Sequence, residues 1–131
     1  MLLEALNYVE KIKVALLLSG LENFGDFHII ESLKEHLPDG DIELKVFSID
    51  TQNPAKTVKE LEDYRPHFTM DFNTKGIIWG EKEGKKFPLH AVLGTIHLTF
   101  VTEDPLAYAP NLLNLREVPN TVFLITDLRF G

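Results

Sequence analysis

The chain has 131 residues, 44% hydrophobic and 25% charged, which is the composition of one ordinary folded domain. A formal net charge of -7 argues against nucleic acid or an anionic membrane as the main partner, because phosphate groups would repel the protein. Cysteine is absent, which excludes disulfides, thiolate catalysis and cysteine-ligated metal centres. The start lacks the features of a secretion signal and no apolar run is long enough to span a bilayer, so we expect a cytoplasmic protein.

Five apolar segments are predicted to be β-strands. They cover residues 13–19, 44–50, 67–73, 97–103 and 121–127. The first and the last are apolar at successive positions rather than at alternate ones, which indicates burial on both faces. Burial of this kind is typical of a parallel sheet that is covered by helices on both sides.

Helical patterns separate the first three strands. Asp26 can cap a helix whose apolar stripe runs to Leu37, and the Pro-Asp-Gly sequence at 38–40 ends it. Asn53 followed by proline predicts the start of a second helix, which continues through Tyr64 until a proline ends it.

The third crossover, residues 74–95, is longer and less regular. It is predicted to hold a small hairpin that turns at 83–84, and then a short helix over 88–93 that a glycine terminates. After the fourth strand, the Asp-Pro pair at 104–105 opens a short turn of helix that Pro110 interrupts.

Repeated strand, crossover and strand units are right-handed. The pattern therefore predicts a single Rossmann-like, doubly wound α/β domain over residues 1–131, with three layers and a five-stranded, mainly parallel sheet in the order 3-2-1-4-5. Its switch point would lie between strands one and four, which places loop 20–27 beside 103–108, with 71–75 further along the same edge. A ligand is expected at these three loops.

Gly20 begins a loop with the glycine spacing of a phosphate loop. Asp26 and Phe27, however, stand where such a loop needs a lysine and a hydroxyl residue. We interpret the glycines as turn residues, with Asn23 and Phe24 retaining a role in shaping a polar binding pocket together with Gly20.

Two carboxylates, Glu103 and Asp104, end the fourth strand. Adjacent carboxylates can differ in environment and pKa, so that one acts as a general base or holds a sugar hydroxyl. Asp104 has a helix to cap, which leaves Glu103 freer to meet a ligand. Asp71 and Asn73 alternate along the third strand and should point to one side, where they bind hydroxyls or close a turn before Gly76.

The histidines predict no metal site, because their spacing with one another and with the carboxylates gives no ligand set. His97 is expected to be packed and hydrogen-bonded inside the fold. His28, in the first turn of a helix, is expected to be an exposed surface residue or a neutral proton acceptor. We expect neither a metal nor a cofactor.

Two other folds of this class fit less well. A receiver domain needs an acidic pair after strand one and a lysine after strand five, but residues 19–20 are Ser-Gly and 127–128 are Asp-Leu. A flavodoxin needs a hydroxyl-rich phosphate loop after strand one, and residues 21–24 (LENF) do not supply it.

Three segments resemble the amino-terminal domain of the CgeB-like (spore maturation protein) glycosyltransferases. They are Val14–Leu18 (VALLL), Pro66–Asn73 (PHFTMDFN) and His97–Pro105 (HLTFVTEDP). In that family a first Rossmann strand, a Pro-hydrophobic-Asp/Ser-Phe-Asn strand and a strand ending in an acidic residue before proline follow in the same order. Thr99 departs from the pattern, which has a tryptophan near that position.

The resemblance implies a two-lobed GT-B-type transferase. This chain would be its N-terminal half, inactive alone, and would carry a sugar or glycan acceptor, while a C-terminal domain would bind the nucleotide-sugar. Asn23, Asn73, Glu103 and Asp104 match the family's positions at the interdomain cleft, with Glu103 as the base. Two alternatives stay open: a stand-alone small-ligand-binding or protein-interaction module, which a stable homodimer would favour, and a flavin or nucleotide carrier.

Overall fold

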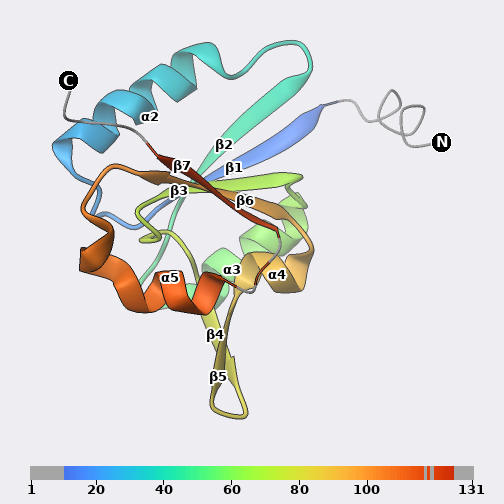
Figure 1. Ribbon diagram of the computed structural model, residues 1–131. Helices are drawn as coiled ribbons and strands as arrows, with labels where there is room; N and C mark the ends of the chain where they lie inside the picture. Colours follow the sequence, from blue (N-terminus) through green and yellow to red (C-terminus); the bar gives the residue numbers. More distant parts are fainter. Residues whose placement is uncertain (1–10, 117, 119, 126–131) are drawn as a thin grey trace.

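The computed structural model describes residues 11–116, 118 and 120–125 (Figure 1). Five strands form a parallel sheet; they are β1 (Ile12–Leu18), β2 (Ile42–Ser48), β3 (Phe68–Phe72), β6 (Ile96–Val101) and β7 (Thr121–Ile125). The connections hold helices and a two-stranded hairpin: α2 (Phe24–His36), α3 (Pro54–Tyr64), β4 (Trp79–Lys82), β5 (Lys85–Pro88), α4 (Leu89–Leu93), the 3₁₀ turn η1 (Pro105–Tyr108) and α5 (Ala109–Leu115). The predicted strands are confirmed, except that residues 126 and 127 of the last one lie outside the described residues.

Helices cover both faces of the sheet, which confirms the Rossmann-like, three-layer α/β architecture. Figure 1 shows α2 on one face and α3, α4 and α5 on the other. Ile30 of α2 packs on its face against an apolar cluster, Val14, Leu16, Met70 and Phe72. Leu61 of α3 packs on the opposite face against Ala15, Leu17 and Phe47.

The predicted strand order is wrong. The observed order is β2-β1-β3-β6-β7, which is 2-1-3-4-5 when the sheet strands are numbered along the chain. Strands one and four are therefore not neighbours, because β3 pairs with β1 on one side and with β6 on the other. The winding direction changes between β1 and β3, so the switch point lies there.

Burial explains why β3 rather than β2 takes the central position. β2 carries Glu43 and Lys45 and is only partly buried along most of its length, as suits an edge strand. β3 is buried from Thr69 to Phe72 on both faces. The predicted order would have placed the charged strand inside the sheet and the buried one at its edge.

The predicted hairpin turn and the predicted end of the short helix are confirmed, and two predicted helix boundaries are corrected. The hairpin turns at Glu83 and Gly84, whose φ angles of 55° and 76° suit a tight hairpin turn, and Gly94 ends α4 with φ 71°. Helix α2 is capped by Asn23 rather than Asp26, because Asp26 is the third helical residue and closes a capping box with Asn23. Pro110 does not end the helical segment, since it lies in the first turn of α5.

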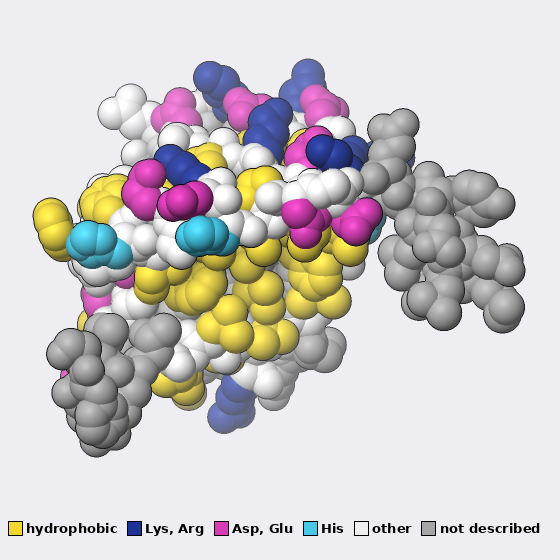
Figure 2. All heavy atoms as spheres, turned by 90° about the horizontal axis from the view of Figure 1, so that it is seen from above, with side chains coloured by type: hydrophobic (Ala, Val, Ile, Leu, Met, Phe, Trp, Pro, Cys, Tyr) yellow, Lys and Arg dark blue, Asp and Glu magenta, His cyan; other side chains and the backbone are white. Residues whose placement is uncertain are grey.

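One sheet face is only partly covered by helix. The apolar side chains of β6 and β7 on the α2 side include Ile96 and Val122, both 42% exposed, with Leu98 and Phe100 partly buried between them. Figure 2 shows the molecule from this side. A broad area of hydrophobic side chains, in yellow, lies beside a band of charged side chains, in blue and magenta.

Candidate binding site at the carboxyl edge of the sheet

Three loops meet at the carboxyl edge of the sheet, as expected for parallel strands. Asn23 follows β1, Asn73 follows β3 and Glu103 follows β6. Although β3 separates β1 from β6, the side chain of Asn23 still reaches across to Glu103, with Nδ2 3.0 Å from Oε2. The structure therefore brings together three of the residues that the sequence analysis selected.

Glu103 is the centre of this cluster. Its Oε2 accepts hydrogen bonds from Asn23 Nδ2 and, at 3.3 Å, from Asn73 Nδ2, and it forms an ion pair with Lys75 Nζ. Lys75 Nζ also donates to the carbonyl oxygen of Leu21 at 2.9 Å. The side chains of Lys75 and Glu103 are 24% and 29% exposed, so a ligand can reach both from solvent. We call Asn23, Asn73, Lys75 and Glu103 the rim cluster.

The electrostatics of the rim cluster keep Glu103 ionised. The hydrogen bond from the Lys75 ammonium group lowers the pKa of Glu103; partial burial opposes this effect, and the hydrogen bond from Asn23 adds to it. A carboxylate with a lowered pKa is a weak proton acceptor at neutral pH. The environment therefore favours Glu103 as a fixed negative charge that binds a donor over the predicted general base.

Asn73 ties the end of β6 to the end of β3. Its φ of 54° is left-handed, a conformation that asparagine tolerates. Its Oδ1 accepts from the backbone N–H groups of Thr102 and Glu103 at 2.8 and 3.0 Å, and its Nδ2 donates to Thr102 Oγ1 at 2.8 Å. Thr102 Oγ1 in turn donates to the fully buried Asp26 of the capping box. The rim cluster therefore has a rigid base.

The loop after β1 is filled by its own carboxylate. Glu22, which is almost fully buried, accepts from Ser19 N–H at 2.9 Å, Ser19 Oγ at 2.8 Å and Gly20 N–H at 2.8 Å. These are donors that a phosphate would use. Gly20 has φ 88° and so serves the turn itself, as predicted, whereas Gly25 is not a turn residue but lies in the first turn of α2.

Asp71 lies in the core and not at the rim. The left-handed backbone at Asn73 breaks the strand alternation, so Asp71 and Asn73 do not point to one side as predicted. Asp71 is fully buried and accepts from Gly76 N–H at 2.8 Å, while its other oxygen lies 2.8 Å from His97 Nε2. A Cβ on Gly76 would come within 2.5 Å of the Leu17 carbonyl oxygen, which explains the glycine there.

Asp104 and Phe24 stay outside the hydrogen bonds of the rim cluster. Asp104 is exposed, and its Oδ1 accepts from Leu106 N–H at 3.0 Å, so it caps η1 as the sequence suggested. Phe24 is 82% exposed and contacts His28 edge to face, with ring centroids 5.5 Å apart. Phe24 therefore adds an exposed aromatic surface next to Asn23.

A second polar cluster is buried between β6 and α4. His97 is packed and hydrogen-bonded, as predicted, with Nδ1 2.6 Å from Thr69 Oγ1. His90 stacks on it with ring centroids 4.5 Å apart, and its Nε2 lies 2.7 Å from Thr121 Oγ1. Burial and, secondly, the neighbouring His97 lower the pKa of His90 to about 3, while Asp71 opposes the shift, so His90 is neutral at physiological pH.

Sequence reasoning missed Lys75, Glu22 and His90. Lys75 stands two positions after Asn73 in the same loop, so the loop that supplied Asn73 also held the signal for Lys75. Within the residues that the structure describes, no three His, Asp or Glu side chains group closely enough to hold a metal ion. None of the described helices combines the length and the apolar character that crossing a membrane requires.

Comparison with known proteins gives one distant relative and no family. An "Uncharacterized protein" of Aquifex aeolicus (strain VF5) is 30% identical over 118 residues, which are 90% of this chain and 29% of that protein. The chain thus spans less than a third of the length of the relative that it matches. No family model matches the chain, and no solved structure matches it either.

Proposed function

We propose that this chain is the acceptor-side, Rossmann-like domain of a larger two-lobed transferase of the GT-B type, as its resemblance to the CgeB-like glycosyltransferases implies. A C-terminal lobe would supply the nucleotide-sugar site. The proposal is supported by the Aquifex relative, because the aligned 118 residues are only 29% of that protein and leave ample sequence for a second lobe. The α/β architecture is compatible with such a lobe.

The observation that carries the proposal is the convergence of three side chains, from the loops after β1 and β3, on one oxygen of Glu103. Asn23, Asn73 and Lys75 all reach Oε2, whereas Oε1 accepts no hydrogen bond from the described residues. A half-buried, ionised carboxylate with one free oxygen is suited to accept a hydrogen bond from a hydroxyl group. The ammonium group of Lys75 keeps that acceptor charged.

The exposed ring of Phe24 extends the proposed acceptor site. Phe24 follows Asn23 in the chain and is 82% exposed, so its ring offers an apolar surface beside the polar rim cluster. A sugar presents hydroxyl groups at its edge and an apolar C–H surface on its ring face. A site with both a carboxylate and an aromatic ring therefore fits a saccharide better than a purely ionic ligand.

The test is a titration of the ¹⁵N-labelled chain with a panel of mono- and disaccharides. Binding is monitored through the NMR chemical shifts of the backbone amides. At least one saccharide should cause saturable shifts at 22–24, 73–75 and 102–104, and Glu103→Gln should weaken its binding about tenfold. Glu31→Gln is the matched control, because Glu31 is an exposed glutamate of α2 that lies outside the rim cluster. Shifts that are absent for every saccharide would contradict the proposal. So would transfer from nucleotide-sugars by the isolated chain.

A protein-interaction module is the second candidate, and the open sheet face over β6 and β7 favours it. Ile96 and Val122 are exposed there in an apolar surface that another lobe or a second copy would cover. Sedimentation of the wild-type chain and of Val122→Lys distinguishes the two candidates. If the wild-type chain is a dimer and Val122→Lys is a monomer, the result supports the interaction module. If both proteins are monomers, the result supports the first candidate, in which another lobe covers this face.

A further inference from the structure

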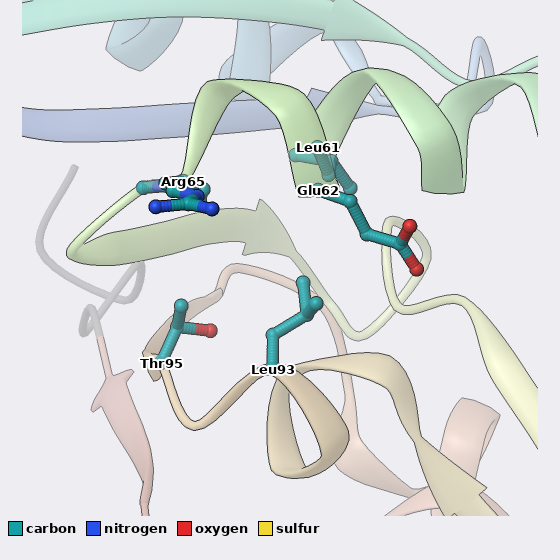
Figure 3. Close-up of a pocket in the computed structure, with 6 residues that line it drawn as sticks. Leu61, Glu62, Arg65, Leu93 and Thr95 are labelled. Atoms are coloured by element: carbon teal, nitrogen blue, oxygen red, sulfur yellow. The ribbon is translucent and has the colours of Figure 1, made fainter.

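A pocket lies at the amino edge of the sheet, opposite the edge that holds the rim cluster. It has a volume of about 340 Å³ and lies between the end of α3 and the end of α4 (Figure 3). The residues that line it are Leu61, Glu62, Arg65, Pro66, Leu93 and Thr95. We call it the amino-edge pocket. Because Pro66 precedes β3 and Thr95 precedes β6, the pocket is separate from the rim cluster at the carboxyl edge.

Thr95 gives the pocket a buried hydroxyl group without a partner. Thr95 is only 7% exposed, and among the described residues nothing forms a hydrogen bond with its Oγ1. Its backbone is fixed, since its N–H donates to the His90 carbonyl at 3.1 Å and its own carbonyl accepts from Asn120 Nδ2. An unpaired buried hydroxyl costs free energy, so a ligand group that bonds to it recovers that cost.

Arg65 gives the pocket a cation. It follows α3 in a left-handed conformation with φ 54°, and its N–H bonds to the Leu61 carbonyl at 3.0 Å. Its guanidinium forms no ion pair with the part of the chain that the structure describes. Figure 3 shows Arg65 and Thr95 on one side of the pocket and the Glu62 carboxylate on the other. The planar guanidinium group matches a carboxylate through two parallel hydrogen bonds.

We propose that the amino-edge pocket binds a small organic acid. The carboxylate pairs with Arg65 and accepts a hydrogen bond from the Thr95 hydroxyl group. A short branched apolar group packs between Leu61 and Leu93. A phosphate dianion fits less well, because Glu62 and the net charge of -7 repel its two charges more strongly than the single charge of a carboxylate, and because the leucines offer it no partner. The proposal adds a ligand site that is independent of the acceptor site at the rim cluster.

The experiment is a titration of the ¹⁵N-labelled chain with isovalerate, with the neutral isovaleramide as the matched ligand control. Isovalerate should cause saturable amide shifts confined to 61–66 and 93–95, and isovaleramide should bind at least about tenfold more weakly. Arg65→Asn and Thr95→Val should each weaken isovalerate binding. Asparagine tolerates the left-handed backbone and valine has the shape of threonine, so both variants should fold.

Lys59→Gln is the protein control, because it removes a different exposed cation from α3 that does not line the pocket. It should bind isovalerate like the wild type. The absence of saturable shifts, shifts located at the rim cluster, or equal binding by Arg65→Asn would overturn the proposal. Tighter binding of N-acetylglycyl-leucine than of isovalerate would assign the carboxylate to the end of a peptide and would overturn the assignment to a free acid.

Discussion

On one face of β3, Met70 and Phe72 join the apolar cluster that Ile30 of α2 completes, whereas on the other face Thr69 and Asp71 enter a chain of hydrogen bonds with His97. The same strand thus supports two interiors of different chemistry. The apolar interior depends on filled volume, since its contacts are non-directional. The polar interior depends on pairing, because each unpaired buried group costs free energy.

This difference predicts how each face responds to substitution. A change of shape should damage the apolar face, and a change of charge or hydrogen bonding should damage the polar face even when the shape is kept. The experiments below make one kind of change on each face and compare the free energies of unfolding.

Phe72→Ala should have the largest effect. Phe72 is fully buried and stacks on Phe100 with ring centroids 5.1 Å apart, so its truncation leaves a cavity in the apolar face. We expect a loss of about 3–5 kcal/mol in the free energy of unfolding, measured by urea denaturation. Leu106→Ala is the control, because Leu106 is exposed and its truncation should change stability by less than about 0.5 kcal/mol. Equal losses for the two variants would show that the apolar face is not tightly packed.

Asp71→Asn should have the next largest effect, although it keeps the shape of the side chain. Asp71 accepts from Gly76 N–H with one oxygen and lies beside His97 Nε2 with the other, and asparagine keeps only one accepting oxygen for these two partners. We expect a loss of about 2–3 kcal/mol by the same measurement. Asp63→Asn, an exposed carboxylate on α3, is the matched control and should be close to neutral. An unchanged free energy of unfolding for Asp71→Asn would show that the polar interior does not depend on this pair of acceptor oxygens.

The fold could largely be predicted from the sequence, because strand burial and helix ends leave local signals. The hairpin turn at 83–84 and the glycine that ends α4 at Gly94 are examples. The predicted strand order is wrong, because residues 44–50 and 67–73 both fit a strand by their apolar content and differ only in their polarity. Glu43 and Lys45 held the missing signal, since charged side chains on a strand mark the edge of a sheet.

The candidate site could be predicted in part. Strand ends alone place Asn23, Asn73 and Glu103 at one edge, and this placement survives the change in strand order. The partners of each side chain could not be predicted. Asn73 turns left-handed and separates from Asp71, and Lys75 approaches Glu103 only because the loop after β3 folds back toward the β1 loop. Such contacts depend on loop backbone geometry, which residue spacing does not specify.

Lowering the pH should decrease the free energy of unfolding through His90 in the polar interior. The pKa of His90 is lowered to about 3 in the folded state from an ordinary value of 6.5, so below pH 6.5 the unfolded chain binds a proton that the folded chain does not. The contribution to stability is therefore complete above pH 6.5 and is lost as the pH falls toward 3. The free energy of unfolding should change by at most about 1.4 kcal/mol per pH unit, because the unfolded chain binds one more proton than the folded chain.

Thermal unfolding between pH 6.5 and 5.5 measures this slope above the ordinary pKa of 4.5 at which Glu103 begins to titrate in the unfolded chain. His90→Gln should flatten the slope, because glutamine does not titrate. His36→Gln is the control for an exposed histidine and should leave the slope unchanged. An identical slope in wild type and His90→Gln would show that another group causes the acid sensitivity.

The smallest effects should come from a pair of matched substitutions on the polar face. Thr99 and Thr95 are both buried, but Thr99 Oγ1 accepts from Thr74 N–H at 3.1 Å, whereas no described residue pairs with Thr95 Oγ1. Thr99→Val should cost about 1–2 kcal/mol, because it leaves a buried N–H unpaired. Thr95→Val should be neutral or slightly stabilising, because valine keeps the shape and removes an unpaired hydroxyl. Urea denaturation of both variants measures the two changes in the free energy of unfolding. An equal loss for Thr95→Val and Thr99→Val would show that the Thr95 hydroxyl group has a hydrogen-bond partner in the free protein.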